Sequence, residues 1–111
     1  MALFTARLAT LVTSNFFFRI RILTVFKLTT MTTDKYEKVI AGLAGVGAGN
    51  PAGRLHHVAT VAEGGSIVVT DVWESAEKLE AFGAALFPVL QRAGVTPVAP
   101  EVTPVHGMIV G

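Results

Sequence analysis

The sequence predicts an α+β fold in which four strands and two helices follow one another in the order β-α-β-β-α-β. Three observations support this. Short β-branched runs have the length and spacing of strands. Two longer segments carry apolar residues at helical spacing. A Gly-Gly turn joins the two central strands, so these strands must be antiparallel. Both helices then cover one face of a four-stranded antiparallel sheet, and the other face is bare.

The composition favours a single small domain that needs a partner. The chain has 111 residues, of which 51% are hydrophobic and only 15% are charged. A chain this short has difficulty hiding so much apolar surface, so we expect a second copy to cover the bare sheet face. The absence of cysteine excludes disulfides, thiolate nucleophiles and cysteine-ligated metals. It fits a reducing compartment, and we expect a cytoplasmic protein.

The charges divide the chain into an extension and a body. Residues 1–19 are basic, acid-free and rich in Thr and Ser, and they are too short and too polar to span a bilayer. They form a dispensable extension, an extra helix or a transit sequence, and the sequence leaves these alternatives open. The body, residues 20–111, is the predicted domain. Residues 31–111 hold five basic and eight acidic side chains, so we expect no nucleic-acid partner.

The first half of the domain reads as a strand and a helix. Residues 20–28 alternate between two faces and form the predicted first strand. A helix is expected from about Asp34, with Asp34 and Glu37 as a capping-box-like pair and Tyr36 in its buried stripe. The glycine-rich segment that follows lacks the Lys-Ser/Thr of a phosphate-binding loop, so we interpret it as a structural loop.

The second half adds a hairpin, a helix and a last strand. Residues 55–62 form the second strand, residues 63–66 the turn, and a third strand runs from Ile67 to Trp73. Ser75 is the expected N-cap of a helix that extends to about Arg92, which Pro88 should bend or break and Gly94 should end. Residues 101–110 are predicted as a last strand, placed at a sheet edge because Pro104 cannot donate a ladder hydrogen bond.

A family resemblance rests on three segments. They are the string TDVWES at residues 70–75 with the following Leu79 and Phe82, the upstream FKLTTMTTDKYEKV at residues 26–39, and the terminal PVHGMIV at residues 104–110. Over residues 20–111 the chain resembles the antibiotic-biosynthesis-monooxygenase-like (ABM-like) proteins of the dimeric α/β-barrel superfamily. The resemblance implies ferredoxin-like protomers that pack sheet against sheet as a homodimer, with a cleft between each sheet and its own helices.

The resemblance also bears on the site. Asp71 and Trp73 occupy positions similar to the family's recurrent acid and tryptophan. Phe82 stands where many members have a histidine, and Gly83 stands where haem-degrading relatives have an iron-ligating histidine. The haem site therefore lacks its ligand, and we expect no cofactor.

His57 and His106 are the candidate proton-transfer groups, because each lies in a predicted strand among apolar residues and histidine titrates near neutral pH. The alternative is that they are half-buried histidines bonded to backbone or water. By alternation, His57 shares a face with Leu55, Ala59 and Val61, and His106 shares one with Val102, Pro104 and Met108. No carboxylate motif accompanies them, so we expect no metal.

The other candidate site residues are Asp71, Trp73 and Tyr36. A carboxylate in an apolar strand is costly to bury unless it is bonded, so Asp71 either faces water at a sheet edge or has a task. Trp73 is either a wall of the core or a surface on which a planar substrate stacks. Tyr36, the only tyrosine, either edges the cleft or simply packs. The expected substrate-binding residues are Tyr36, Trp73, Phe82 and Leu86.

Two functions remain open at this level. The first is a cofactor-independent monooxygenase or isomerase that acts on a small hydrophobic or planar molecule, with Asp71, Trp73, and His57 or His106 as the catalytic set. The second is a non-catalytic dimeric module that binds small molecules or is associated with stress. The sequence does not decide between an enzyme and a binding protein, because this fold hosts many functions.

Overall fold

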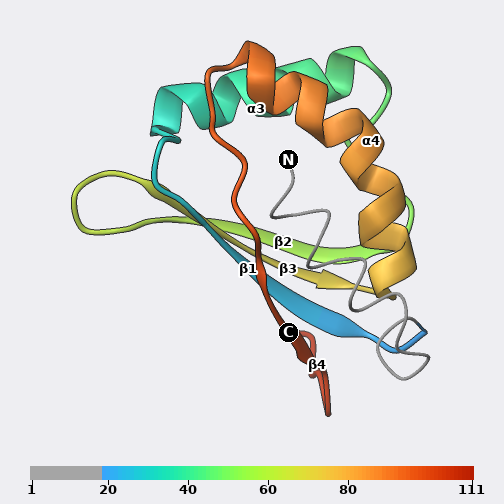
Figure 1. Ribbon diagram of the computed structural model, residues 1–111. Helices are drawn as coiled ribbons and strands as arrows, with labels where there is room; N and C mark the ends of the chain where they lie inside the picture. The colour runs from blue at the N-terminus through green and yellow to red at the C-terminus, as the bar shows by residue number, and fades with distance from the viewer. Residues whose placement is uncertain (1–18) are drawn as a thin grey trace.

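A computed structural model describes residues 19–111. It contains four strands and two helices, in the order β1, α3, β2, β3, α4, β4. The sheet is antiparallel with strand order β2-β3-β1-β4, and both helices lie on one of its faces (Figure 1). This confirms the predicted α+β class and four-stranded antiparallel sheet, and it is compatible with a ferredoxin-like fold. The proposed extension, residues 1–19, lies outside the described residues apart from Arg19.

The elements have the following bounds. The strands are β1 (Ile22–Leu28), β2 (Arg54–Val61), β3 (Ile67–Trp73) and β4 (Glu101–Pro104), and the helices are α3 (Thr33–Gly45) and α4 (Ala76–Arg92). Neither helix is both long enough and apolar enough to cross a membrane, a statement that covers residues 19–111.

Both helices begin at a side-chain cap. The hydroxyl of Ser75 accepts a hydrogen bond from the Lys78 amide (3.3 Å), as predicted for α4. For α3 the predicted capping pair of Asp34 and Glu37 is wrong. Thr32 is the N-cap, and its hydroxyl accepts from the Lys35 amide (3.2 Å). The helix therefore starts one residue earlier, at Thr33, because the Thr32 hydroxyl already accepts from one of the free N–H groups of the first turn.

Proline and glycine act as the sequence predicts at most of their positions. Gly64 and Gly65 have φ of 95° and 94° in the hairpin turn, and Gly94 has φ of 73° after α4. These are values that glycine adopts without steric cost. Pro88 lies inside α4 without breaking it, since the helix continues to Arg92.

The buried core lies between the sheet and the helices. In β1 and β3 every second residue is buried, and the buried set faces the helices. The core consists of Ile22, Phe26, Leu28, Met31, Val39, Leu43, Ile67, Val69, Trp73, Ala76, Leu79, Phe82, Val89, Leu90 and Val95. Thr24 and Asp71 are buried polar residues on the same face, opposite each other in the register of β1 and β3. A polar pair thus lies within an apolar layer.

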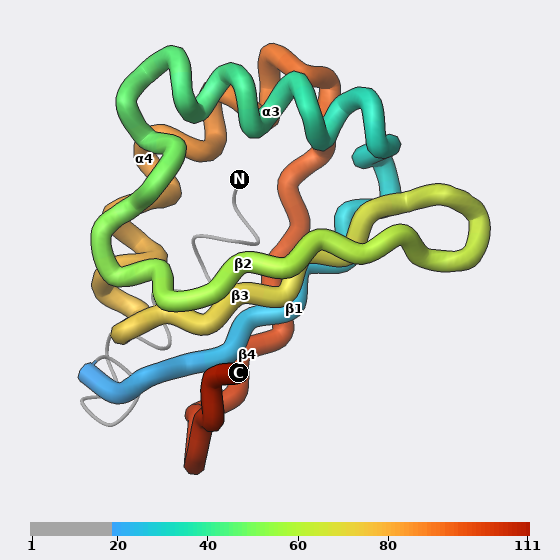
Figure 2. Tube along the Cα trace, turned by 180° about the vertical axis from the view of Figure 1, so that it is seen from behind, coloured from blue at the N-terminus to red at the C-terminus, as the bar shows by residue number. Residues whose placement is uncertain are grey.

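The opposite face of the sheet carries no helix or strand from residues 19–111 (Figure 2). Its side chains include several aliphatic ones, which are Leu23, Val25, Val58, Val68 and Val72. Val58 is 53% exposed. An exposed ion pair between Lys27 and Glu101 (3.3 Å) lies at the β4 side of this face and contributes little to stability.

The last strand is shorter than predicted. It ends at Pro104, which pairs with Ile22, and the amide of Val105 donates to the Arg21 carbonyl (2.9 Å). Because β1 begins at Ile22, the chain has no further strand to pair with beyond this point. The prediction that places His106 in a strand is therefore wrong, and His106 is exposed.

Gly53, the residue before β2, has both a backbone conformation and a close contact that favour glycine. Its φ is +86°, its carbonyl accepts from the Glu74 amide (2.7 Å), and an added Cβ would lie 2.5 Å from Lys78 Cγ. Gly64 has a similar φ of +95° but open space around it. We expect Gly64→Ala to cost about 1–2 kcal/mol from backbone strain alone. Gly53→Ala should cost more, because Lys78 must also move. Urea unfolding of both variants measures this, and equal losses would show that the contact with Lys78 is unimportant.

Candidate functional site

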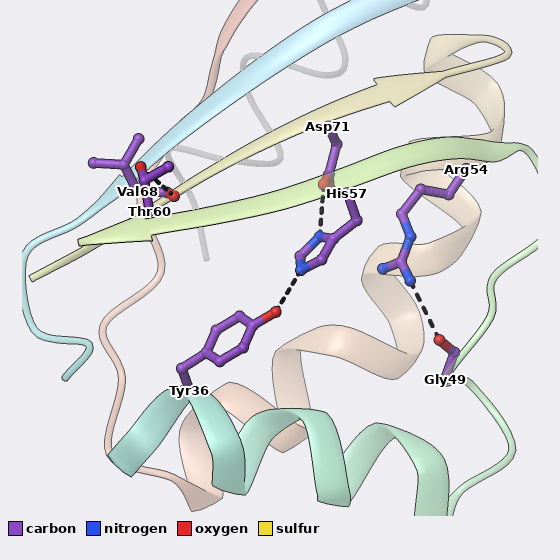
Figure 3. A network of polar contacts seen from close by, with 7 residues as sticks. All are labelled: Tyr36, Gly49, Arg54, His57, Thr60, Val68 and Asp71. Carbon is purple, nitrogen blue, oxygen red and sulfur yellow. Dashed lines mark hydrogen bonds and ion pairs between the residues drawn. The ribbon is translucent and has the colours of Figure 1, made fainter. Parts of the chain in front are cut away.

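Three polar side chains form a continuous hydrogen-bonded chain between the sheet and helix α3 (Figure 3). The Tyr36 hydroxyl lies 2.7 Å from His57 Nε2, and His57 Nδ1 lies 2.7 Å from Asp71 Oδ1. Each residue comes from a different element, α3, β2 and β3. The site therefore exists only in the folded protein.

The register of the sheet brings His57 and Asp71 together. His57 and Asp71 are direct partners across β2 and β3, on the face that the helices cover. β3 lies between β2 and β1, so Asp71 is in the interior of the sheet, and its side chain is only 6% exposed. The alternative that Asp71 faces water at a sheet edge is therefore wrong. Its burial is tolerable because the imidazole N–H bonds to the carboxylate.

The hydrogen-bonding capacities of the three groups determine which atom donates and which accepts in each of the two hydrogen bonds. An ionised carboxylate only accepts, so the Nδ1–H of His57 donates to Asp71. In the neutral imidazole Nε2 then carries the lone pair, and the Tyr36 hydroxyl donates to it. The two rings are nearly parallel, at 9° with centroids 6.0 Å apart. Because the hydroxyl bonds to a ring nitrogen, they meet tip to tip rather than face to face.

Tyr36 is held in its protonated form. Burial raises the pKa of its hydroxyl above the ordinary value of 10.0, and the negative charges of Glu37 and Asp71 add to the rise, while Arg54 opposes it. Tyr36 is therefore a phenol at neutral pH, and it can accept a proton only as it passes its own to His57. This makes it a relay rather than a free tyrosinate.

The three hydrogen-bonded side chains, Tyr36, His57 and Asp71, border an apolar cavity between the sheet and the helices. The cavity has a volume of about 60 Å³. Its polar lining residues are Tyr36, Arg54, His57 and Asp71, and the rest of its wall is apolar, formed by Phe26, Leu28, Met31, Val39, Ile40, Leu43, Val69, Leu79, Phe82, Leu86, Phe87, Leu90, Pro97 and Val98. An apolar pocket with a few converging polar groups is the usual form of a small-molecule site.

The structure brings together most of the predicted site residues. His57, Asp71, Tyr36, Phe82 and Leu86 all line the cavity.

Trp73 and His106 do not line it. Trp73 is fully buried and packs on Phe82, with ring centroids 5.4 Å apart. Its indole N–H has no hydrogen-bond partner among residues 19–111. Trp73 is thus a core residue next to the cavity, in agreement with the packing alternative.

Arg54 is the polar residue of the cavity wall that the sequence did not reveal. Strict alternation places residues 54 and 57 on opposite faces of a strand. In the structure Arg54 pairs with Trp73, and His57 pairs with Asp71, because β2 has an irregular register between Arg54 and His56. The extra residue, Leu55, puts both side chains on the helix face. Alternation is interrupted at Leu55, so the face of its side chain does not follow from the position of His57.

The single tyrosine makes the state of this site measurable. We expect the tyrosinate absorbance of the native protein to titrate with a midpoint above 10.0, and to return to about 10 in denaturant. Because the pKa of Tyr36 is higher in the folded than in the unfolded state, the protonated hydroxyl stabilises the fold. This contribution to stability is complete below pH 10 and is lost as pH rises through the folded pKa. The unfolding free energy should fall less steeply above pH 10 in Tyr36→Phe than in the wild type. A native midpoint at or below 10 would contradict the assignment.

No protein-family model, curated protein or solved structure matches the chain at a significant level.

Proposed function

We propose that the protein is a cofactor-independent acid–base enzyme of the isomerase or monooxygenase type, acting on a small hydrophobic or planar molecule. The observation that carries the proposal is the chain from Tyr36 through His57 to Asp71 at the wall of an apolar cavity. A histidine oriented by a carboxylate and bonded to a second proton-carrying group is an arrangement suited to general acid–base catalysis. The resemblance to ABM-like proteins supports the same class.

The relay assigns a role to each residue. Tyr36 takes a proton from the bound molecule while its own proton moves to His57 Nε2. The imidazolium that results is stabilised by Asp71, whose carboxylate already accepts from Nδ1. Tyr36 and His57 are the catalytic residues in this scheme, and Asp71 is a positioning residue. The apolar wall excludes water, which strengthens these interactions.

The fate of the deprotonated molecule separates the two reaction types. An isomerase returns the proton from the relay to a different atom of the same molecule. A monooxygenase lets the anion react with dioxygen, so that a CH₂ group becomes a carbonyl, one oxygen atom enters the product and the other leaves as water. Both reactions begin with the same proton transfer.

A non-catalytic binding module is the second candidate, and the size of the cavity favours it. About 60 Å³ is less than the roughly 150 Å³ of an engineered apolar cavity that accommodates benzene. A planar ring therefore enters only with movement of wall side chains. In this reading the hydrogen bonds of Tyr36, His57 and Asp71 serve to stabilise the fold.

Proton exchange separates the enzyme from the binding module. We expect the wild type to accelerate deuterium uptake from heavy water at the α-carbon of enolisable ketones, from cyclopentanone to 2-indanone, as followed by NMR. Tyr36→Phe and His57→Gln should lower the acceleration by about 10²–10⁴-fold. His56→Gln is the matched control, since His56 is exposed on the opposite face of the sheet. Acceleration that survives His57→Gln would eliminate the relay.

We also propose that two copies associate through the helix-free face of the sheet. The support is the set of aliphatic side chains on that face, which no described element covers. Light scattering should show a dimer, and Val58→Glu should dissociate it, because a charge would be buried against the partner. Val61→Glu is the control. Val61 lies in the same strand with 60% exposure, but its partner in the register, Ile67, faces the helices. A monomeric wild type would overturn this proposal.

A further inference from the structure

The guanidinium of Arg54 stands out among the groups of the cavity wall. It carries a positive charge, it is half-buried, and most of the surrounding wall is apolar. Its hydrogen bond goes to the Gly49 carbonyl at 3.3 Å. Among residues 19–111 no carboxylate lies within ion-pair distance of it. A guanidinium has five N–H donors, and this one makes a single hydrogen bond among residues 19–111, so donors remain for a ligand.

The geometry of β2 places the Arg54 side chain on the same face of the sheet as the proton relay. The bulge at Leu55 turns Arg54 to the same face as His57. Figure 3 shows the two side chains extending from β2 toward the helix layer. The positive charge of Arg54 also lowers the pKa of the Tyr36 hydroxyl, in opposition to burial. Bulges commonly re-aim a side chain beside a functional site.

We propose that Arg54 binds the carboxylate of a small apolar acid whose hydrocarbon part occupies the cavity. The proposal rests on the proposed function and specifies its substrate class. A guanidinium fork matches the two oxygens of a carboxylate, and such charge-assisted pairs are stronger than neutral hydrogen bonds. The apolar wall selects the hydrocarbon part. With the carboxylate at Arg54, the neighbouring carbon atoms lie toward Tyr36 and His57, where the proton transfer takes place.

The chain contains a matched control for the charge. Arg92 is also an arginine, but it is exposed in the last turn of α4 and does not line the cavity. Arg92→Gln therefore removes the same charge from the protein without changing the cavity. Arg54→Lys keeps a charge at the site but loses the planar fork, and it serves as a second variant if Arg54→Gln folds poorly.

The test compares butyrate with its neutral counterpart butyramide, which carries the same three-carbon hydrocarbon chain. Dissociation constants are measured by NMR titration of the Tyr36 and His57 backbone amides. We expect the wild type and Arg92→Gln to bind butyrate about tenfold more tightly than butyramide. Arg54→Gln should bring the ratio close to one, and Arg54→Lys should leave an intermediate ratio.

Failure of this inference is distinguishable from failure of the proposed function. Tyr36→Phe should keep the preference for butyrate, because it leaves Arg54 in place, although it should stop proton exchange. A butyrate preference that depends on Arg54, in a protein without exchange activity, supports the acid-binding site and removes the enzyme. A wild type with no preference, a wild type that binds neither probe, or a preference unchanged in Arg54→Gln would overturn the inference.

Discussion

The hydrogen bond between His57 and Asp71 is the interaction on which the site depends. Asp71 lies in an interior strand with almost no exposure, where an unpaired carboxylate would be strongly unfavourable. The imidazole satisfies it at 2.7 Å and is itself fixed in one tautomer by doing so. The other ring nitrogen is thereby left to accept from Tyr36. One cross-strand contact thus stabilises a buried charge and prepares a proton acceptor.

Three parts of the fold contribute different things to the cavity. The sheet supplies the charged and titratable groups, Arg54, His57 and Asp71, at fixed register positions. Helix α3, which begins after the cap at Thr32, supplies the Tyr36 hydroxyl. Helix α4 supplies apolar wall residues, which are Leu79, Phe82, Leu86, Phe87 and Leu90. Three of the four polar lining groups therefore lie on the sheet, which holds them at fixed positions against the hydrocarbon wall of the cavity.

The contrast between Asp71 and Trp73 shows why strand position alone does not identify a site. Both are on the same face of β3, two residues apart, as alternation predicts. Trp73 is at the end of the strand, where α4 begins, and Phe82 covers it. Asp71 lies two residues nearer the start of β3, where its register partner His57 connects it to Tyr36 on α3. The pattern predicted the shared face correctly, whereas the packing of α4 decided which of the two lines the cavity.

The sequence by itself determined the order of elements, the alternation in β1 and β3, the Ser75 cap and the glycine turns. These depend on neighbours within a few residues, so local stereochemistry specifies them. Only the tertiary structure decided that Tyr36 meets His57, that the bulge at Leu55 turns Arg54 into the cavity, and that β4 ends at Pro104. These depend on which strand lies beside which and on how the helices pack on the sheet. Such contacts join residues that are far apart in the chain, and no local pattern encodes them.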